Sequence, residues 1–279
     1  GDLALSATAT IPSGVTLSIA ADGAKISGSG NSINGIVLKS GSTLTGEGTL
    51  TMTGFKTALT SEGGSTITDG TYVFKDNGDK NSHAPGIMLA GSVVGSINAN
   101  SISITASDSD ETNFYTGSTV FKNATLDITS QTWTWSDSKD LTLISASLTL
   151  SGYGQGFYIN KLSMTDSMLR MKDPGKRWGS IPWGSTGFTL QGGQDGVIDN
   201  STIELDYGSN AGLSVGYSSS DTVLNIKNNS VIDFKNGGTG GLNVNTGDVV
   251  LTNSTIKGDG NNSGALFGAQ TNGSIEFKE

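Results

Sequence analysis

Short runs in which apolar and polar residues alternate recur along the whole chain, and Gly, Asn, Asp and Ser separate them. The clearest copy lies in residues 222–248, where three such runs occupy 223–226, 231–234 and 242–244. Alternation with a period of two is typical of a β-strand that buries one face. The pattern therefore predicts units of three short strands joined by tight turns.

These units recur at spacings of about 20 to 34 residues, which is typical of a solenoid of stacked units. We expect residues 1–23 to be an entry segment and residues 24–279 to form roughly nine to ten rungs of one domain. The first strand of each rung is expected to start near the following residues: Ala24, Thr49, Thr71, Ser101, Ala124, Ser147, Ser167, Ser201, Ser230 and Ser254.

An Asn or Asp often ends one unit just before the next begins, as at Asn123, Asp166, Asn200, Asn229 and Asn253. A single residue that turns one strand into the next must often adopt a positive φ, which Asn and Asp tolerate better than other non-glycine residues. We expect Asn200, Asn229 and Asn253 to adopt this geometry. We also expect them to bury their side chains in a hydrogen-bonded ladder that runs from rung to rung.

The pattern of this chain resembles that of the pectate-lyase-like superfamily. The features that carry the resemblance are the Asn turn, the three strands per unit, the phrase IPSGVTLSI at residues 11–19 and the repeated Asn-Ser-Thr-Ile. The resemblance is strongest to the β-helical adhesive domains of bacterial cell-surface proteins. It is a resemblance of pattern over nearly the whole chain and includes no active-site motif. It implies an all-β, single-stranded right-handed parallel β-helix (a β-solenoid). It further implies an extracellular location, secreted or at the cell surface. Residues 274–277 end the sequence on a strand with no polar cap, and because repeat arrays need terminal caps we expect a fragment of a larger protein.

Composition narrows the classes of partner. The 41 Gly and four Pro indicate many tight turns and few helices. A net charge of −9 disfavours nucleic acid and anionic membranes as partners. No stretch approaches the ~18 apolar residues of a membrane span, so we expect no membrane insertion. We expect this fragment to be a monomer, and the absence of Cys leaves its redox compartment open.

Within the first strands, alternate residues should point inward and stack as apolar columns. The predicted inward pairs are Leu50/Met52, Tyr72/Phe74, Ile102/Ile104, Leu126/Ile128, Leu148/Leu150, Leu169/Met171, Ile203/Leu205 and Ile232/Phe234. The predicted outward column is Thr51, Val73, Ser103, Asp127, Thr149, Arg170, Glu204, Asp233 and Lys257. In a second outward column Lys172, Asp206, Lys235 and Asp259 alternate in sign, which is typical of a solvated ion-pair stripe.

All four Trp of the chain lie in two long connections, which follow Ile128 and Met171. Basic residues accompany the second connection, and Tyr158 lies between the two. Flat aromatic side chains beside charged groups are suited to holding sugars or peptide side chains, although a Trp can also anchor its own loop. The predicted binding residues are Trp133, Trp135, Tyr158, Arg170, Lys172, Lys176, Arg177, Trp178 and Trp183. The expected partner is a glycan or a host or bacterial surface protein.

Catalysis is the alternative function, because some polysaccharide lyases and glycoside hydrolases have the β-helix fold that the resemblance implies. Glu204 and Asp233 on consecutive rungs near Arg170 could sit ~5 Å apart, which suits retaining glycoside chemistry. The motifs associated with β-helical galacturonases and pectate lyases are absent, which favours a non-catalytic role; if the chain is an enzyme, Glu204, Asp233 and Arg170 are the expected catalytic residues. Ice binding is disfavoured because charged residues replace the outward Thr and Ser after Ser151.

No cofactor is expected. The lone His83 cannot build a transition-metal site without Cys or further His. Oxygen ligands for Ca²⁺ could come from Asp76, Asn77 and Asp79, or from residues 108–111. Neither group has the spacing of an EF-hand loop.

Overall fold

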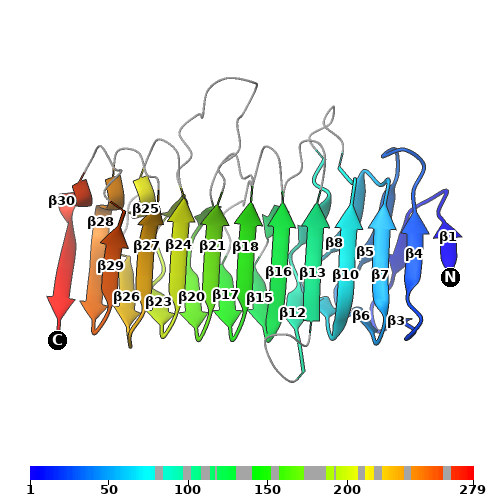
Figure 1. Cartoon of the computed structure of the whole chain (residues 1–279), viewed down its shortest axis with the longest axis horizontal. Coiled ribbons are helices and arrows are strands. Elements are labelled where there is room, and N and C mark those ends of the chain that lie inside the picture. The colour runs from blue at the N-terminus through cyan, green and yellow to red at the C-terminus, as the bar shows by residue number, and fades with distance from the viewer. Residues whose placement is uncertain are drawn as a thin grey trace.

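The computed structural model describes residues 1–78, 84–96, 102–107, 114–116, 118–129, 140–151, 157–172, 187–191, 193–206, 211–216, 222–235, 240–259 and 265–279. Over these residues the chain is a parallel β-solenoid in which three strands form one turn, as the sequence predicts. Figure 1 shows the strands stacked side by side along one axis, with the N-terminus at one end and the C-terminus at the other. No helix in this part of the chain is long and apolar enough to cross a membrane.

The first face of the solenoid is an eleven-stranded parallel sheet. Its strands are β1 (Asp2–Ala4), β4 (Ala24–Ser27), β7 (Thr49–Thr53), β10 (Gly70–Lys75), β13 (Ile102–Ser107), β16 (Ala124–Thr129), β18 (Ser147–Ser151), β21 (Met168–Lys172), β24 (Thr202–Asp206), β27 (Val231–Lys235) and β29 (Thr255–Gly258). From β4 onward, every strand starts within one residue of the predicted position. The predicted entry segment contributes β1, which pairs with β4 and so belongs to the stack.

The second face is divided into two groups of strands. The first group is β2 (Ala9–Ile11), β5 (Asn34–Leu38), β8 (Thr57–Ser61), β11 (Ile87–Leu89) and β14 (Phe114–Thr116). The second group is β19 (Phe157–Ile159), β22 (Phe188–Leu190), β25 (Ala211–Val215) and the first parts of β28 (Gly240–Thr252) and β30 (Ala265–Lys278).

The third face and the second group of the second face belong to one fourteen-stranded sheet. They are joined by the long strand β28, which pairs with β25 through its first part and with β26 through its last part. Its strands are β3 (Thr16–Ile19), β6 (Thr43–Gly46), β9 (Thr66–Ile67), β12 (Ser92–Val94), β15 (Thr119–Lys122), β17 (Leu141–Ile144), β20 (Leu162–Thr165), β23 (Gly196–Asp199) and β26 (Val223–Lys227), followed by the ends of β28 and β30. In Figure 1 the first face runs upward in front and the third face downward behind, while the chain advances from right to left. The winding is therefore right-handed.

The core follows from the alternation in the sequence. All sixteen residues predicted to point inward from the first face are at most 4 % exposed, and Leu242 and Val244 of β28 are also buried. Since each coil covers the next, the apolar residues that point inward from the described strands are buried in the coils between the two ends of the solenoid. The predicted core is confirmed.

One predicted register is wrong. Ser103 was expected beside Val73 in the outward column, but β13 is shifted by two residues, so Thr105 lies between Val73 and Asp127. Phe74 is consequently paired in register with Ala106. A shift of two residues keeps the same side chains inward, so the apolar pattern of the strand does not distinguish between the two registers.

The turn residues adopt the predicted backbone. The φ angles are 50° at Asn123, 48° at Asp166, 45° at Asn200, 64° at Asn229 and 46° at Asn253. The prediction that Asn200, Asn229 and Asn253 bury their side chains is wrong, because all three are exposed. These residues form the outer corner of each turn, and the residue that follows them is the one that points back into the solenoid. Asn200 Nδ2 instead reaches one coil back at the surface and donates to Asp166 Oδ1 at 2.6 Å.

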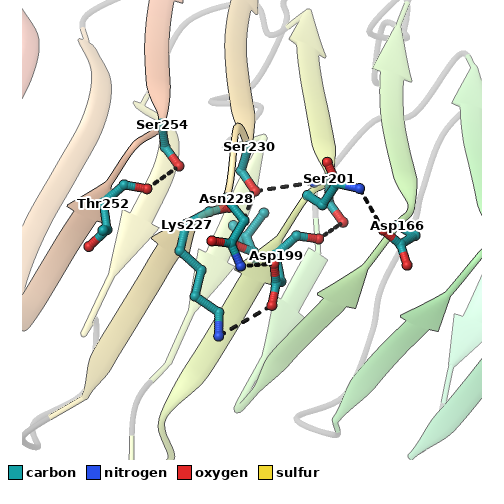
Figure 2. A network of polar contacts seen from close by, with 10 residues as sticks. Asp166, Asp199, Ser201, Lys227, Asn228, Ser230, Thr252 and Ser254 are labelled. Atoms are coloured by element: carbon teal, nitrogen blue, oxygen red, sulfur yellow. Dashed lines mark hydrogen bonds and ion pairs between the residues drawn. The ribbon is translucent and has the colours of Figure 1, made fainter. Parts of the chain in front are cut away.

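The buried ladder is made of serines. The hydroxyl of Ser201 accepts a hydrogen bond from the backbone N of Ser167 at 3.0 Å, and the hydroxyl of Ser230 accepts one from the backbone N of Ser201 at 3.1 Å. Ser167 Oγ likewise accepts from Ala146 N at 3.1 Å. Each of the three hydroxyls donates to a backbone carbonyl at the preceding turn, for example Ser201 to Asp199 O at 2.7 Å. Figure 2 shows the step of this ladder between Ser201 and Ser230, beside the surface contacts of Asp199. The serines thus connect consecutive coils at the corner between the third and first faces.

Candidate functional site

Two connections leave the first face from the same edge. We call residues 130–139 and 173–186 the first and second Trp segments, because they carry Trp133, Trp135, Trp178 and Trp183. The first follows Thr129 at the end of β16, and the second follows Lys172 at the end of β21. Thr129, Ser151 and Lys172 are neighbours in the register of the sheet. The two departure points are therefore two coils apart, about 10 Å.

The four Trp, together with Lys176 and Arg177, lie outside the described residues. The structure therefore places the strand ends that carry both segments and three of the predicted site residues, Tyr158, Arg170 and Lys172.

Arg170 and Lys172 both belong to β21, at the base of the second Trp segment. Arg170 points outward between Thr149 and Glu204, and its Nε forms an ion pair with Glu204 Oε2 at 2.5 Å. The hydrogen bond to Glu204 raises the pKa of Arg170, so this guanidinium is charged at any physiological pH. Lys172 is the last residue of the strand and is exposed.

Tyr158 lies on the second face, on the coil that precedes Arg170 and Lys172. It belongs to β19 and is partly exposed. In the sheet it pairs with Thr189 of β22, and β22 is the strand to which the second Trp segment returns. The structure thus brings Tyr158 to the strand beside the return point of that segment, and Lys172 to its departure point.

The two carboxylates of the catalytic alternative are neighbours. Glu204 and Asp233 are paired in register on β24 and β27. Each is held by cations: Arg170 binds Glu204, whereas Lys235 Nζ and Lys257 Nζ bind Asp233 Oδ2 at 2.8 and 3.1 Å. The Asp233 side chain is only 7 % exposed, while that of Glu204 is 30 % exposed.

Both carboxylates are thus engaged in ion pairs with basic side chains of the same strand or an adjacent strand. The hydrogen bond to Asp233 raises the pKa of Lys235 and keeps the ammonium charged beside the carboxylate. A nucleophile or proton donor needs an open face towards its substrate, but Asp233 is covered by two lysines. The outward column predicted from the sequence places Lys257 one rung after Asp233, so the ion pair between these two residues could be predicted. The near-complete burial of the carboxylate could not.

Among the described residues, no group of three or more His, Asp or Glu lies close enough together to hold a metal ion. Asn77 is buried, and its side chain is engaged with the backbone: Oδ1 accepts from Phe55 N and Nδ2 donates to Met52 O, both at 3.1 Å. Asp79, His83 and residues 108–111 lie outside the described part of the chain.

No family model, curated protein or solved structure matches this chain.

Proposed function

We propose that this chain is a non-catalytic adhesive domain of a bacterial secreted or cell-surface protein, which recognises a glycan or a protein on a host or neighbouring cell. The observation that carries the proposal is the common departure edge of the two Trp segments, at Thr129 and Lys172. The strand ends that precede these two Trp-bearing segments lie about 10 Å apart on one parallel sheet.

The chemistry of this edge suits a polar ligand with flat apolar faces. Indole rings bury much surface against a sugar ring or a peptide side chain, and their N–H groups can still donate hydrogen bonds. Arg170 and Lys172 supply positive charge at the base of the second segment of an otherwise acidic protein. The ion pair with Glu204 holds the Arg170 side chain in place, so its orientation does not depend on the ligand.

The scaffold suits a binding role for a second reason. Stacked strands form a stiff support, and connections between them can vary in length without disturbing the core. The secreted or cell-surface location and the bacterial origin follow from the resemblance in the sequence pattern, and they form part of the same proposal.

A glycan array and a mucin-binding assay on this chain test the proposal. The double variant Trp178→Ala/Trp183→Ala should retain the melting temperature and lose at least ~2 kcal/mol of binding free energy, about thirtyfold in Kd. Lys172→Ala should weaken binding by a smaller factor. Its matched control is Lys25→Ala, which removes an exposed lysine from β4 on the same sheet, far from this edge, and should change nothing.

Two outcomes would contradict the proposal. If the Trp variant binds as well as the original chain but melts at a lower temperature, the indoles only anchor their own loops. Release of reducing or unsaturated sugars from an acidic polysaccharide, abolished by Glu204→Gln, would show an enzyme instead.

A further inference from the structure

The second group of strands on the second face carries a row of polar side chains on its outer side. This outer row consists of Tyr158, Thr189, Ser214 and Asn243, which are neighbours in register on β19, β22, β25 and β28. The residues that flank its members on β22, β25 and β28 are buried in the core: Phe188, Leu190, Leu213, Val215, Leu242 and Val244. Since side chains alternate between the two sides of a strand, the outer row points away from the core.

The middle of the outer row is nevertheless buried. Thr189 is 1 % exposed and Ser214 is 6 % exposed, whereas Tyr158 and Asn243 at the two ends of the row are partly exposed. Neither the Thr189 hydroxyl nor the Ser214 hydroxyl forms a hydrogen bond with any residue that the structure describes. A buried hydroxyl without a partner costs free energy, because it has lost its hydrogen bonds to water. The row therefore contains two adjacent hydroxyls whose hydrogen-bonding capacity is unused.

Unused buried hydroxyls are exceptional in this chain. Apart from Thr57 of β8, the other buried polar side chains of the described residues all form hydrogen bonds or ion pairs. Thr57 stands alone, whereas Thr189 and Ser214 lie one coil apart, ~4.8 Å. In a native protein such groups call for a partner from outside the chain, either an ordered water or a ligand.

The chemistry of the outer row suits an uncharged ligand that is rich in hydroxyl groups. Residues 157–160, 188–191, 211–216 and 240–246 contain no Asp, Glu, Lys or Arg. The hydroxyl and amide groups of the row both donate and accept hydrogen bonds, as the hydroxyls of a sugar do. The ring of Tyr158 adds a flat apolar surface for the face of a sugar ring.

The backbone of these strands is not available to an extended peptide. Strand β22 pairs with β19 and β25, and β25 pairs with β22 and β28, so their N–H and C=O groups bond within the sheet. A peptide that binds by strand addition needs an open strand edge. Recognition at the outer row is left to side chains, which favours a glycan over a peptide.

We propose that the outer row is a subsite for a neutral glycan, whose hydroxyls bond to Thr189 and Ser214 while Tyr158 packs on a ring face. The bound sugar takes the place of the atoms that cover the two hydroxyls in the free chain. The row spans three coil steps, ~14 Å, so it contacts an extended ligand. This inference rests on the proposed adhesive function and names its ligand class, because the second Trp segment returns to the scaffold at β22.

Binding to immobilised mucin, before and after enzymatic removal of its sialic acids, tests the proposal. The double variant Thr189→Val/Ser214→Ala removes both hydroxyls and changes the size of the side chains little. The original chain should bind the desialylated mucin, and the double variant should bind it at least about tenfold more weakly, because the sugar hydroxyls lose their partners. Thr189→Ser keeps the hydroxyl and should retain most of the binding.

Thermal stability separates a binding role from a structural one. Because the two hydroxyls have no partner in the described part of the free chain, their removal should leave the melting temperature unchanged or raise it. The matched control is Thr142→Val, which removes an outward hydroxyl from β17 on the third face. It should change neither the binding nor the melting temperature.

Three results would overturn the proposal. The double variant could bind desialylated mucin as tightly as the original chain, or it could melt at a lower temperature, which would show that the hydroxyls stabilise the fold. Binding that disappears with the sialic acids would show an acidic ligand instead. In each case the adhesive function stands if binding to mucin or to a protein still depends on Trp178 and Trp183. A chain that binds no glycan and no surface protein would overturn both proposals.

Discussion

The serine ladder can be tested by removing one hydroxyl, and Ser201→Ala is the most informative change. Ser201 Oγ accepts from the backbone N of Ser167 and donates to the carbonyl of Asp199. The substitution keeps the Cβ and the backbone, and it leaves the Ser167 N–H without its partner in a corner where Ser167 is only 6 % exposed. A buried, unsatisfied backbone donor costs about 1–3 kcal/mol, and we expect a loss of that size in the free energy of unfolding.

Ser254→Ala is the matched control. Ser254 follows the same turn one coil after Ser230, and its hydroxyl donates to Thr252 O at 2.9 Å. The backbone N of Ser230 bonds to the Lys227 carbonyl at 3.3 Å, so the Ser230 amide keeps this partner when the Ser254 hydroxyl is removed. This control should lose no more than the ~1 kcal/mol of an ordinary hydrogen bond.

Urea unfolding followed by circular dichroism measures the difference. Long repeat arrays can depart from two-state behaviour, so the midpoints should be compared only where the denaturant dependence is unchanged. The reasoning about the ladder is refuted if Ser201→Ala unfolds at the same midpoint as Ser254→Ala. It is also refuted if Ser201→Ala is within ~0.5 kcal/mol of the original chain, as substitutions away from such features usually are.

Three further predictions follow. Ile232→Ala should lower the free energy of unfolding by ~2–5 kcal/mol, measured by urea unfolding, because the coils on either side cannot collapse into the cavity. Asn229→Ala should destabilise by about 1–2 kcal/mol because alanine tolerates its φ of 64° poorly, whereas Asn229→Gly should not lower the melting temperature. The hydrogen bond from Asn228, with a further one from Lys227, holds the pKa of the Asp199 carboxyl below its ordinary value. A depressed pKa contributes stability above the unfolded value near pH 4, which is lost as the pH falls, so Asp199→Asn should flatten the acid side of a melting-temperature profile.

The local pattern of apolar and polar residues is sufficient to predict the architecture of stacked coils. Alternation within each run decides which side chains can face a core, and the recurrence of the run requires stacked coils. The Asn and Asp corners are equally readable, because a positive φ is a property of the single residue that adopts it. For these reasons the pattern of residues correctly predicts the inward side chains, the strand starts and the backbone geometry of the turns.

The common departure edge of the two Trp segments could be predicted only in part. Clustering of the four Trp in two connections is visible in the sequence, and parallel strands make a common departure edge plausible. Whether the two segments leave the sheet at matching positions depends on the register of β16, β18 and β21. That register is set by packing across the solenoid.

The sequence alone determined the fold class, the residues that form the core and the backbone of the corners, since each depends on short-range pattern. Only the tertiary structure decided the relations between coils. It placed Thr105 where Ser103 was expected and gave the buried ladder to the serines. It also placed Lys235 and Lys257 against the carboxylate of Asp233. Each of these depends on which residue lies one coil away, some 20 to 34 positions along the chain, and a shift of two residues there leaves the local pattern unchanged.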